Sequence, residues 1–334
     1  MVNMIGDINR LRPHIKTHKT AEIIKMQQEH GIFKYKCATI PEAALLGKCG
    51  AEDVLLALQP VGINVSRFFD LMGTYPKTTF STLVDNVFSV QSLSQTAKAG
   101  NTKVGIYLDL NTGMNRTGIL PGKEAVQLYS IIHADPFLIA RGLHAYDGHI
   151  RNVNIDERTR ACNAAFEPVL QLKTVLEGQG IAVDSVIAGG SPTFPVHCRR
   201  KGVEASPGTT LLWDEGYATS FGDMPFVPAA ILITRIISKP KSDLVCLDLG
   251  HKAIAPEMEF PRARILGMED CNQIGQSEEH LVLKCPSNSD FAVGELFYAI
   301  PMHICPTVAK YAELLTVEDN LITGAWRVAA RDHS

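Results

Sequence analysis

The sequence lacks the features that mark several classes of protein. In its 334 residues no apolar run approaches the roughly 18 residues of a transmembrane helix, and the opening MVNMIGDINRLR lacks the apolar stretch of a secretory signal. The 32 Lys and Arg residues nearly balance 35 Asp and Glu residues, without a basic stripe. We therefore expect neither a membrane nor a nucleic acid as a partner. The chain also has no internal repeat and no low-complexity segment.

The eight cysteines form no CxxC pair and show no spacing typical of a small disulfide-bonded domain. In a chain of this length without a secretory signal, this usage predicts reduced thiols in a cytoplasmic protein. We expect most of the cysteines to be buried as small hydrophobic residues. The exception is Cys305, which belongs to a candidate metal site.

Short β-rich runs alternate with helical segments through the first two thirds of the chain. If RPHIK ends a first strand, seven further candidate strands follow, in runs that begin near residues 33, 53, 78, 103, 138, 184 and 203. Eight strands that alternate with helices predict a closed TIM-type (β/α)8 barrel of parallel strands, which we assign to residues 1–223. An open, doubly wound sheet is the alternative.

From about Met224 the pattern changes to β-like runs that are separated by Gly, Pro, Asn and Asp. Such runs predict a mostly antiparallel β domain, which we assign to residues 224–334. Helical spacing returns only around VAKYAELLTV, at residues 308–317.

Polar residues gather where the predicted barrel strands end, and barrels of this type carry their active sites there. They include Lys16, Asp109, Arg116, His144, Tyr146, Asp147 and His149. Two glycine-rich turns, GGSPT (189–193) and SPGTT (206–210), follow the last two predicted strands. Because glycine lets backbone N–H groups approach an anion and hydroxyls add donors, these turns predict a phosphate site.

A lysine at the end of the first strand, in a barrel with a phosphate site, indicates Schiff-base chemistry. A lysine must be desolvated or lie near other cations to act as an amine. The motif around Lys16 supplies such cations in Arg12, His14, His18 and Lys19. The simpler alternative is that Lys16 and Lys19 are solvated surface charges.

The stretch MHIC places His303 two residues before Cys305. On a strand, residues i and i+2 point the same way, so the two side chains could share one metal ion. Imidazole and thiolate together favour zinc over magnesium or calcium. On spacing alone, a buried cysteine beside a helix-capping histidine explains the pair better.

These motifs resemble those of the D-serine dehydratase/D-threonine aldolase family, whose members are alanine-racemase-like, fold-type III enzymes that use pyridoxal 5′-phosphate (PLP). The matching stretches run in order along nearly the whole chain: RPHIKTHKT, DLNTGMNRTGI, GLHAYDGH, AGGSPT, ASPGTT, CLDLGHKA, QSEEHL and PMHICPT. Members of the family carry a further segment before the first motif, so we expect this chain to be truncated at its N-terminus.

The resemblance implies roles for the matched residues in the barrel. Lys16 resembles the lysine that holds PLP, and Arg116 resembles the arginine near the phenolic oxygen of PLP. His144 and Tyr146 resemble residues that line its ring. The phosphate group is expected at Gly190, Ser191, Gly208 and Thr209.

The resemblance also assigns the metal pair. His303 and Cys305 match the pair that binds a divalent metal in this family. The cysteine version resembles zinc-containing dehydratases, whereas the aspartate version resembles aldolases that prefer manganese. Zinc and dehydration are therefore favoured here, with manganese or magnesium as the other metals.

The implied function is that of a PLP- and metal-dependent lyase, a cytoplasmic homodimer that acts on a small D-3-hydroxy amino acid. Dehydration would give a 2-oxo acid and ammonia, and aldol cleavage would give glycine and an aldehyde; the residues named do not choose between them. The alternatives are an amino-acid racemase of the alanine racemase type, a non-catalytic PLP-binding protein, and a barrel that binds no PLP.

Overall fold

The structure is a computed structural model that describes residues 1–287 and 290–332. It divides the chain into two compact units. Unit 1 comprises Met1–Gly208 together with Asp332, and unit 2 comprises Thr209–Arg331. The division between Gly208 and Thr209 precedes the boundary at residues 223 and 224 that the change of sequence pattern suggested.

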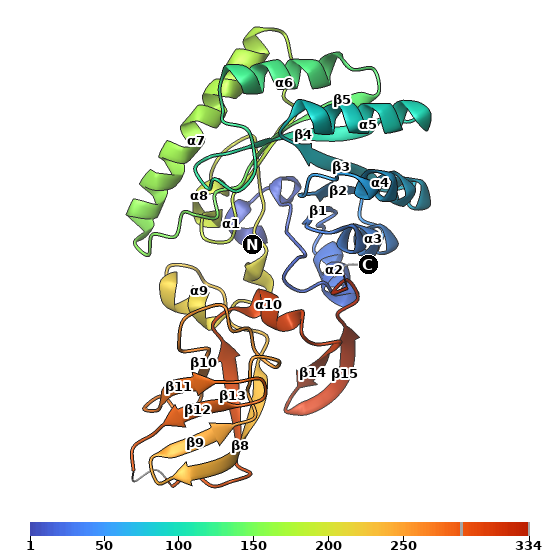
Figure 1. The fold of residues 1–334 in the computed structure, drawn as a ribbon. Coiled ribbons are helices and arrows are strands. Elements are labelled where there is room, and N and C mark those ends of the chain that lie inside the picture. The colour runs from blue at the N-terminus through green and yellow to red at the C-terminus, as the bar shows by residue number, and fades with distance from the viewer. Residues whose placement is uncertain (288–289, 333–334) are drawn as a thin grey trace. The chain divides into compact units, whose positions relative to one another are not determined.

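Unit 1 is an α/β structure in which strands and helices alternate (Figure 1). Its parallel sheet follows the sequence order β1 (Lys34–Cys37), β2 (Asp53–Leu56), β3 (Thr79–Val84), β4 (Val104–Leu110), β5 (Leu138–Ala145), β6 (Ser185–Ala188) and β7 (Val203–Ala205). The helical segments are α1 (Val2–Ile5), η1 (Ile8–Arg10), α2 (Ala21–Glu29), α3 (Ile40–Lys48), α4 (Ile63–Thr74), α5 (Val87–Ala99), α6 (Lys123–Ala134), α7 (Ile155–Gly178) and α8 (Phe194–His197).

The segment 11–15 joins the two edges of this sheet. Leu11 bridges Ala205 of β7, and His14 bridges Lys36 of β1, both in parallel. The N–H of His14 also donates to the carbonyl of Pro207 at 2.8 Å, and the N–H of Lys36 donates to that of Pro13 at 2.9 Å. The predicted barrel is confirmed, with 11–15 as an irregular eighth strand; the doubly wound alternative is wrong, because the strand order is sequential.

Charges inside this barrel pair with one another around the buried Arg12, at the beginning of β1 and β2. Arg12 contacts Asp53 at 2.8 Å and Glu204 at 2.6 Å, and Lys34 contacts Glu204 at 2.9 Å. Burial alone would lower the pKa of Arg12 and raise that of Asp53, but the ion pair outweighs it in both cases. We call Arg12, Lys34, Asp53 and Glu204 the barrel charge network.

Unit 2 is mostly antiparallel, as predicted. Its six-stranded sheet has the order β10 (Ala263–Ile265), β13 (Leu296–Pro301), β8 (Leu232–Lys241), β9 (Leu244–Leu247), β12 (Leu281–Lys284) and β11 (Asn272–Gln276). Short helical segments accompany it: η2 (Thr209–Leu211), α9 (Glu215–Ser220) and α10 (Ile304–Val308). Its core includes the buried residues Ile236, Leu247, Leu281 and Ala299.

The expectation of reduced thiols is wrong for Cys271 and Cys285, which form a disulfide. Antiparallel pairing aligns Asn272 of β11 with Lys284 of β12. The two cysteines flank this pair and therefore face each other across the hairpin, with Cα atoms 4.3 Å apart. Sequence reasoning missed the bond because it did not predict the register of these two strands.

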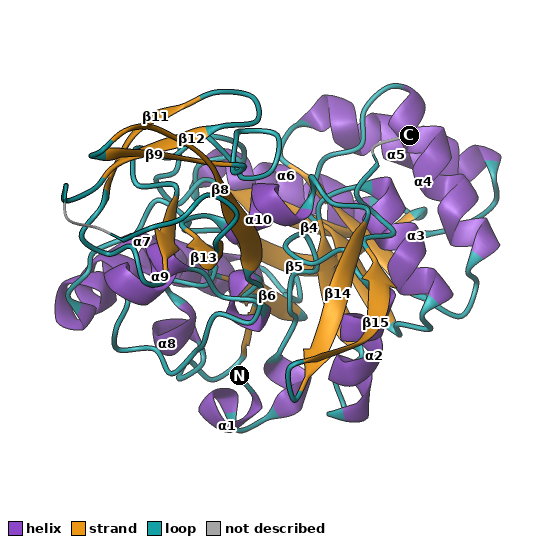
Figure 2. Ribbon diagram, turned by 90° about the horizontal axis from the view of Figure 1, so that it is seen from below, coloured by secondary structure: helices purple, strands orange, loops and turns teal. Residues whose placement is uncertain are grey.

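The helix expected at residues 308–317 is also wrong for most of its length. Helix α10 ends at Val308, and the chain then forms a hairpin of β14 (Glu313–Glu318) and β15 (Leu321–Arg327), visible in Figure 2. Asp319 and Asn320 connect the strands with positive φ angles of 50° and 64°. Such a two-residue turn is typical of a hairpin, so the dipeptide Asp-Asn was the signal that could have identified it.

No helix in the described ranges combines the length and the apolar surface that a membrane span needs. The longest helix, α7, begins with Asp156, Glu157 and Arg158 and carries further charges along its length.

Candidate active site

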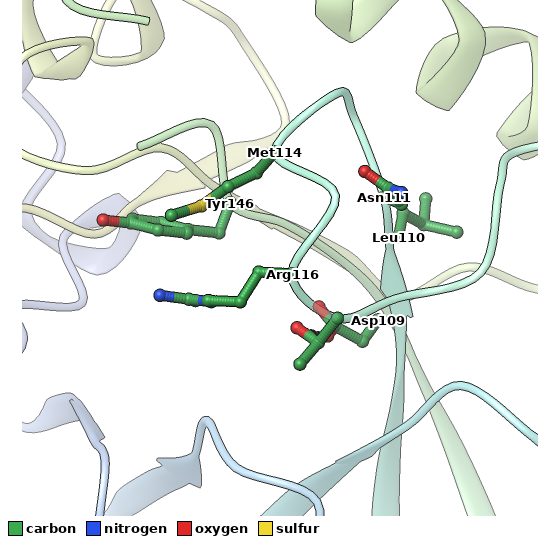
Figure 3. Close-up of a pocket in the computed structure, with 7 residues that line it drawn as sticks. Asp109, Leu110, Asn111, Met114, Arg116 and Tyr146 are labelled. Carbon is green, nitrogen blue, oxygen red and sulfur yellow. Dashed lines mark hydrogen bonds between the residues drawn. The ribbon is translucent and has the colours of Figure 1, made fainter. Parts of the chain in front are cut away.

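A small pocket in unit 1 lies at the ends of β4 and β5. It is lined by Asp109, Leu110, Asn111, Met114, Arg116, Thr117 and Tyr146. Figure 3 shows Arg116 extended alongside the Tyr146 ring, with Met114 on the other side of that ring. The guanidinium carbon of Arg116 is 5.0 Å from the ring centroid, within the range of a cation–π contact.

The loop after β4 is built to present Arg116. Asn111 Oδ1 accepts hydrogen bonds from the N–H groups of Gly113 and Asn115, at 3.0 and 3.1 Å. Gly118 adopts a φ of 96°, and a Cβ there would lie 2.6 Å from the backbone nitrogen of Asn111. This position therefore requires glycine. The motif DLNTGMNRTGI thus folds into a fixed turn, from which Arg116 projects.

His144 and Asp109 form a buried pair on neighbouring strands. His144 Nδ1 lies 2.7 Å from Asp109 Oδ1, while Asp109 Oδ2 accepts from Gln59 and Thr117. Burial lowers the pKa of His144 despite the nearby carboxylate. The other ring nitrogen, Nε2, is buried and has no hydrogen-bond partner in the described part of the chain. A buried polar atom of this kind is a candidate for contact with a ligand.

Two glycines make room for the Tyr146 ring. A Cβ on Gly190 would lie 3.0 Å from Tyr146 Cε2, and a Cβ on Gly148 would collide with the ring and its hydroxyl. Glycine at 190 therefore keeps the backbone of the AGGSPT turn close to Tyr146. Tyr146, which is predicted to line the cofactor ring, and Gly190, which is predicted to bind the phosphate, are therefore neighbours.

The two glycine-rich turns also meet. The N–H of Gly208 donates to Ser191 Oγ at 3.2 Å, and Ser191 is buried. A Cβ on Gly208 would lie 3.1 Å from both the Cβ and the carbonyl oxygen of His14. Gly190, Ser191 and Gly208 thus belong to one region of unit 1, whereas Thr209 is the next residue along the chain and begins unit 2.

Lys16 follows the segment that closes the barrel. Its side chain is exposed, and its ammonium makes no hydrogen bond or ion pair with any described residue. Its backbone N–H donates to His14 Nδ1 at 3.1 Å. His14 has a lowered pKa because it is desolvated and lies near Lys16, Lys36, Lys19 and His144.

The cations expected to surround Lys16 are mostly engaged or neutral. Arg12 belongs to the barrel charge network, and Lys19 is buried against Glu42. His18 is buried, which lowers its pKa to about 3. The explanation from the motif alone is therefore wrong for these three residues, because a linear motif does not show where each side chain points.

Sequence reasoning missed Lys36, a buried lysine on β1 on which the charge of Lys16 acts. Lys36 is 3% exposed, and its Nζ lies 5.6 Å from the centroid of the Tyr146 ring. Burial, and next the charge of Lys16, lower the pKa of Lys36 to about 7. The sequence did contain a signal for this residue: Lys36 lies in the short predicted strand KYKC, next to residues that are expected to be buried.

A buried cluster behind Tyr146 holds its loop to the AGGSPT turn. Asp147 Oδ1 accepts from Thr193 Oγ1 at 2.7 Å, and Asp147 Oδ2 lies 2.8 Å from His197 Nε2 and 3.6 Å from Cys162 Sγ. The ligand atoms of Asp147, Cys162 and His197 lie within 4.8 Å of one another, close enough for a metal ion. Burial and the Asp147 charge raise the pKa of the Cys162 thiol to about 12, which disfavours the thiolate that a metal needs.

His303 and Cys305 lie in unit 2, but not on a strand as expected. Strand β13 ends at Pro301, His303 is the N-cap residue of α10, and Cys305 is in its first turn. Asp214 Oδ2 accepts from the N–H of Ile304 at 3.0 Å and so fixes the backbone between them.

The side chains of this pair are nevertheless close. Burial would lower the pKa of His303, but hydrogen bonds with Cys305 and Glu257 raise it overall. Glu257 Oε1 lies 2.5 Å from His303 Nδ1, and Thr209 Oγ1 lies 3.6 Å from Cys305 Sγ. Imidazole, thiolate and carboxylate are ligands that zinc accepts.

The residues present fit both groups that the sequence motifs imply. An amine without a partner at Lys16, an unsatisfied Nε2 at His144 and a backbone turn that is kept bare by Gly190 and Gly208 suit a PLP molecule with an aldehyde, a ring and a phosphate. The donors of His303 and Cys305 suit a divalent metal.

A closed parallel barrel followed by an antiparallel β unit, with these groups at the strand ends, defines an alanine-racemase-like protein. The family model "Alanine racemase, N-terminal domain" matches residues 1–214, and the model "Putative serine dehydratase domain" matches residues 229–317. The first match covers more than half of the chain, so the chain belongs to the alanine racemase family. PLP fits this family, and the donor clusters described above suggest a divalent metal.

Individual relatives match almost the full length. A D-threonine aldolase from Arthrobacter sp. is 26% identical over 97% of this chain and 86% of its own. A 3-hydroxy-D-aspartate aldolase from Paracoccus denitrificans is 25% identical over 96% of this chain and 85% of its own. The crystal structure of D-threonine aldolase from Filomicrobium marinum superposes with a TM-score of 0.91 at 24% identity, covering 99% of this chain and 90% of that one.

Proposed function

We propose that this protein is a PLP- and divalent-metal-dependent lyase that acts on D-3-hydroxy amino acids. The observation that carries the proposal is the exposed amine of Lys16 at the ends of the barrel strands, in a region that also holds the unsatisfied Nε2 of His144 and the glycine-rich turns. The aldolases named among the relatives support the substrate class. A racemase or a non-catalytic PLP carrier has less support, because the serine dehydratase model matches residues 229–317.

Each residue has a defined task in this proposal. Lys16 holds the cofactor through its amine and afterwards accepts or returns the proton at Cα of the substrate. Arg116 and His144 contact the cofactor ring, and Gly190, Ser191, Gly208 and Thr209 hold its phosphate through backbone N–H groups and hydroxyls. When bound, the cofactor supplies an electron sink for the pair of electrons left at Cα.

His303 and Cys305 hold the metal in this proposal, with zinc favoured over manganese or magnesium. A metal with open positions acts as a Lewis acid towards a substrate hydroxyl. Loss of that hydroxyl as water, followed by hydrolysis, gives a 2-oxo acid and ammonia. Cleavage of the Cα–Cβ bond instead gives glycine and an aldehyde. The presence of cysteine at 305 favours dehydration, and we include a homodimer in the proposal.

The test is incubation of the purified protein with PLP, zinc and D-serine, D-threonine or D-3-hydroxyaspartate, with assays for ammonia, 2-oxo acid, glycine and aldehyde. We expect turnover of at least one substrate and none of its L-enantiomer. Chelation should abolish turnover and zinc should restore it in the wild type, but not in Cys305→Ala. Cys49→Ala, which removes a partly buried free thiol in unit 1, is the matched control. Failure to turn over any D-3-hydroxy amino acid would overturn the proposal.

A further inference from the structure

The side chain of Lys36 lies inside the barrel, where its ammonium faces the Tyr146 ring but no acceptor among the described residues. Lys36 is the third residue of β1 and is 3% exposed. Its ammonium makes no hydrogen bond or ion pair with any residue that the structure describes. A buried ammonium without an acceptor is unfavourable, because it loses water and gains nothing in return.

Two other cations of the barrel interior, the partly exposed Lys34 and the buried Arg12, do have ion-pair partners. Lys34, two residues earlier, points to the same side of β1 and contacts Glu204 at 2.9 Å. Arg12 contacts both Asp53 and Glu204. Lys34 and Arg12 thus have carboxylate partners, whereas Lys36 has none within residues 1–287 and 290–332.

The nearby carboxylates are already occupied. Asp109 accepts from His144, Gln59 and Thr117 through its two oxygens.

Asp147 likewise uses its two carboxylate oxygens for contacts with Thr193, His197 and Cys162. These two aspartates favour the charged form of Lys36 electrostatically, whereas burial and the charges of Lys16 and Arg12 oppose it, so that its pKa falls to about 7. The neutral amine of Lys36 is thus poised to take up a proton when an anionic acceptor arrives.

The position of Lys36 directs it to the proposed cofactor site. Its Nζ is 5.6 Å from the centre of the Tyr146 ring, on which Arg116 also lies at 5.0 Å. His14, which bridges Lys36 through the backbone, lies within electrostatic reach of both Lys36 and Lys16. Lys36 therefore faces the same region as Lys16, from the strand next to the closing segment.

We propose that Lys36 is a ligand-contacting cation of this site, whose ammonium binds an anionic oxygen of the molecule held in the barrel. With the phosphate of PLP assigned to the glycine-rich turns, two sources of such an oxygen remain: the phenolic oxygen of PLP and the carboxylate of the amino acid. This inference rests on the proposed function and adds a residue that the motifs did not indicate.

The first arm of the test measures the cofactor alone. PLP and 3-deoxypyridoxal 5′-phosphate, which lacks the phenolic oxygen, are titrated into the apoprotein while the absorbance of lysine-bound cofactor is followed. If the partner is the phenolic oxygen, Lys36→Met weakens PLP binding about tenfold and leaves binding of the deoxy analogue unchanged. Lys36→Arg, which keeps the charge, retains part of the preference for PLP.

The second arm measures the substrate. If the partner is a substrate carboxylate, Lys36→Met binds PLP as the wild type does, and KM for the substrate rises about tenfold with a smaller change in kcat. Lys34→Met is the matched control, because it removes a cation from the same face of the same strand, and it should change neither binding constant.

Unchanged cofactor affinity together with unchanged KM in Lys36→Met overturns the inference. Thermal unfolding of each variant establishes that it is folded, and Lys36→Arg provides an independent reading if Lys36→Met unfolds. A wild-type protein that binds no PLP overturns the proposed function itself, and the two failures are thereby distinguished.

Discussion

Two short segments of the barrel each carry two lysines, and in each segment the two lysines differ in the same way. After the closing segment, Lys19 is buried against Glu42, whereas Lys16 is exposed and makes no ion pair within the described ranges. On β1, Lys34 pairs with Glu204, whereas Lys36 has no such partner. The paired lysines serve the fold, and the unpaired ones are available to a ligand.

In this barrel, the charged residues that support the fold are different residues from those that are available to a ligand. Buried charges that have partners add little net stability, but removing one partner is costly because the other charge stays behind. Buried polar or charged groups without partners lower stability. A protein therefore retains such groups mainly at functional sites. The unsatisfied Nε2 of His144 follows the same pattern.

The largest effect is expected for Lys16→Ala. We expect turnover and the absorbance of lysine-bound cofactor to be lost, because the substitution removes the amine to which we assign the cofactor. The free energy of unfolding of the apoprotein should change by less than about 0.5 kcal/mol, because the side chain is exposed and unpaired. Lys25→Ala, an exposed lysine on α2, is the control for both measurements. Retained turnover in Lys16→Ala would contradict the assignment.

Lys19→Met should have the opposite profile. It leaves the fully buried carboxylate of Glu42 without its ion-pair partner, so we expect a loss of about 3–5 kcal/mol in the free energy of unfolding. Urea unfolding monitored by circular dichroism measures it.

The double variant Lys19→Met/Glu42→Gln should recover part of that loss, because an amide oxygen can still accept from the N–H of Ala38. If the single variant is as stable as the wild type, the distinction between Lys16 and Lys19 fails.

The smallest effect separates Lys34 from Lys36. In the apoprotein, Lys36→Met should raise the free energy of unfolding at pH 7 by about 1–3 kcal/mol, because it removes an unpaired buried ammonium. Lys34→Met should lower it by about 1 kcal/mol or less, because Lys34 is partly exposed and Glu204 keeps Arg12.

The pH dependence gives the sign of the Lys36 effect. Its pKa is about 7 in the folded state and about 10.4 in an unfolded chain, so the unfolded state binds more protons between these values. The contribution of Lys36 to stability therefore improves as the pH rises from 7 to 10. The charges that face it are Lys16, Arg12, Asp109 and Asp147. The advantage of Lys36→Met over the wild type should shrink across this range; a constant difference would contradict the shifted pKa.

Much of the fold could be predicted because it depends on local patterns. The strands β1 to β5 are short, largely buried runs that are each followed by a longer helix, and motifs such as DLNTGMNRTGI contain the glycines that their turns require. Arg116 and Tyr146 line one pocket, and His144 pairs with Asp109, which lines it too; the rule that active sites lie at the strand ends had pointed to this edge of the barrel.

What could not be predicted depends on pairing between distant residues. The disulfide of Cys271 and Cys285 requires the register of β11 and β12. That Lys36 has no acceptor in the described part of the chain depends on which residues the other strands bring near it, and no linear motif records this. The contact between His197 Nε2 and Asp147 Oδ2 likewise joins residues that are 50 positions apart in the sequence.

The closing segment has a consequence for the order in which the protein assembles. Its bridge to β7 joins Leu11 to Ala205, so one of its two neighbours is made only after almost the whole barrel has been synthesised. Contacts of such long sequence separation form late in folding, and domains fold as units during synthesis. Lys16 is thus synthesised long before Ala205 but reaches its place only after β7 is available, so a nascent barrel has no positioned amine until its final strand is present.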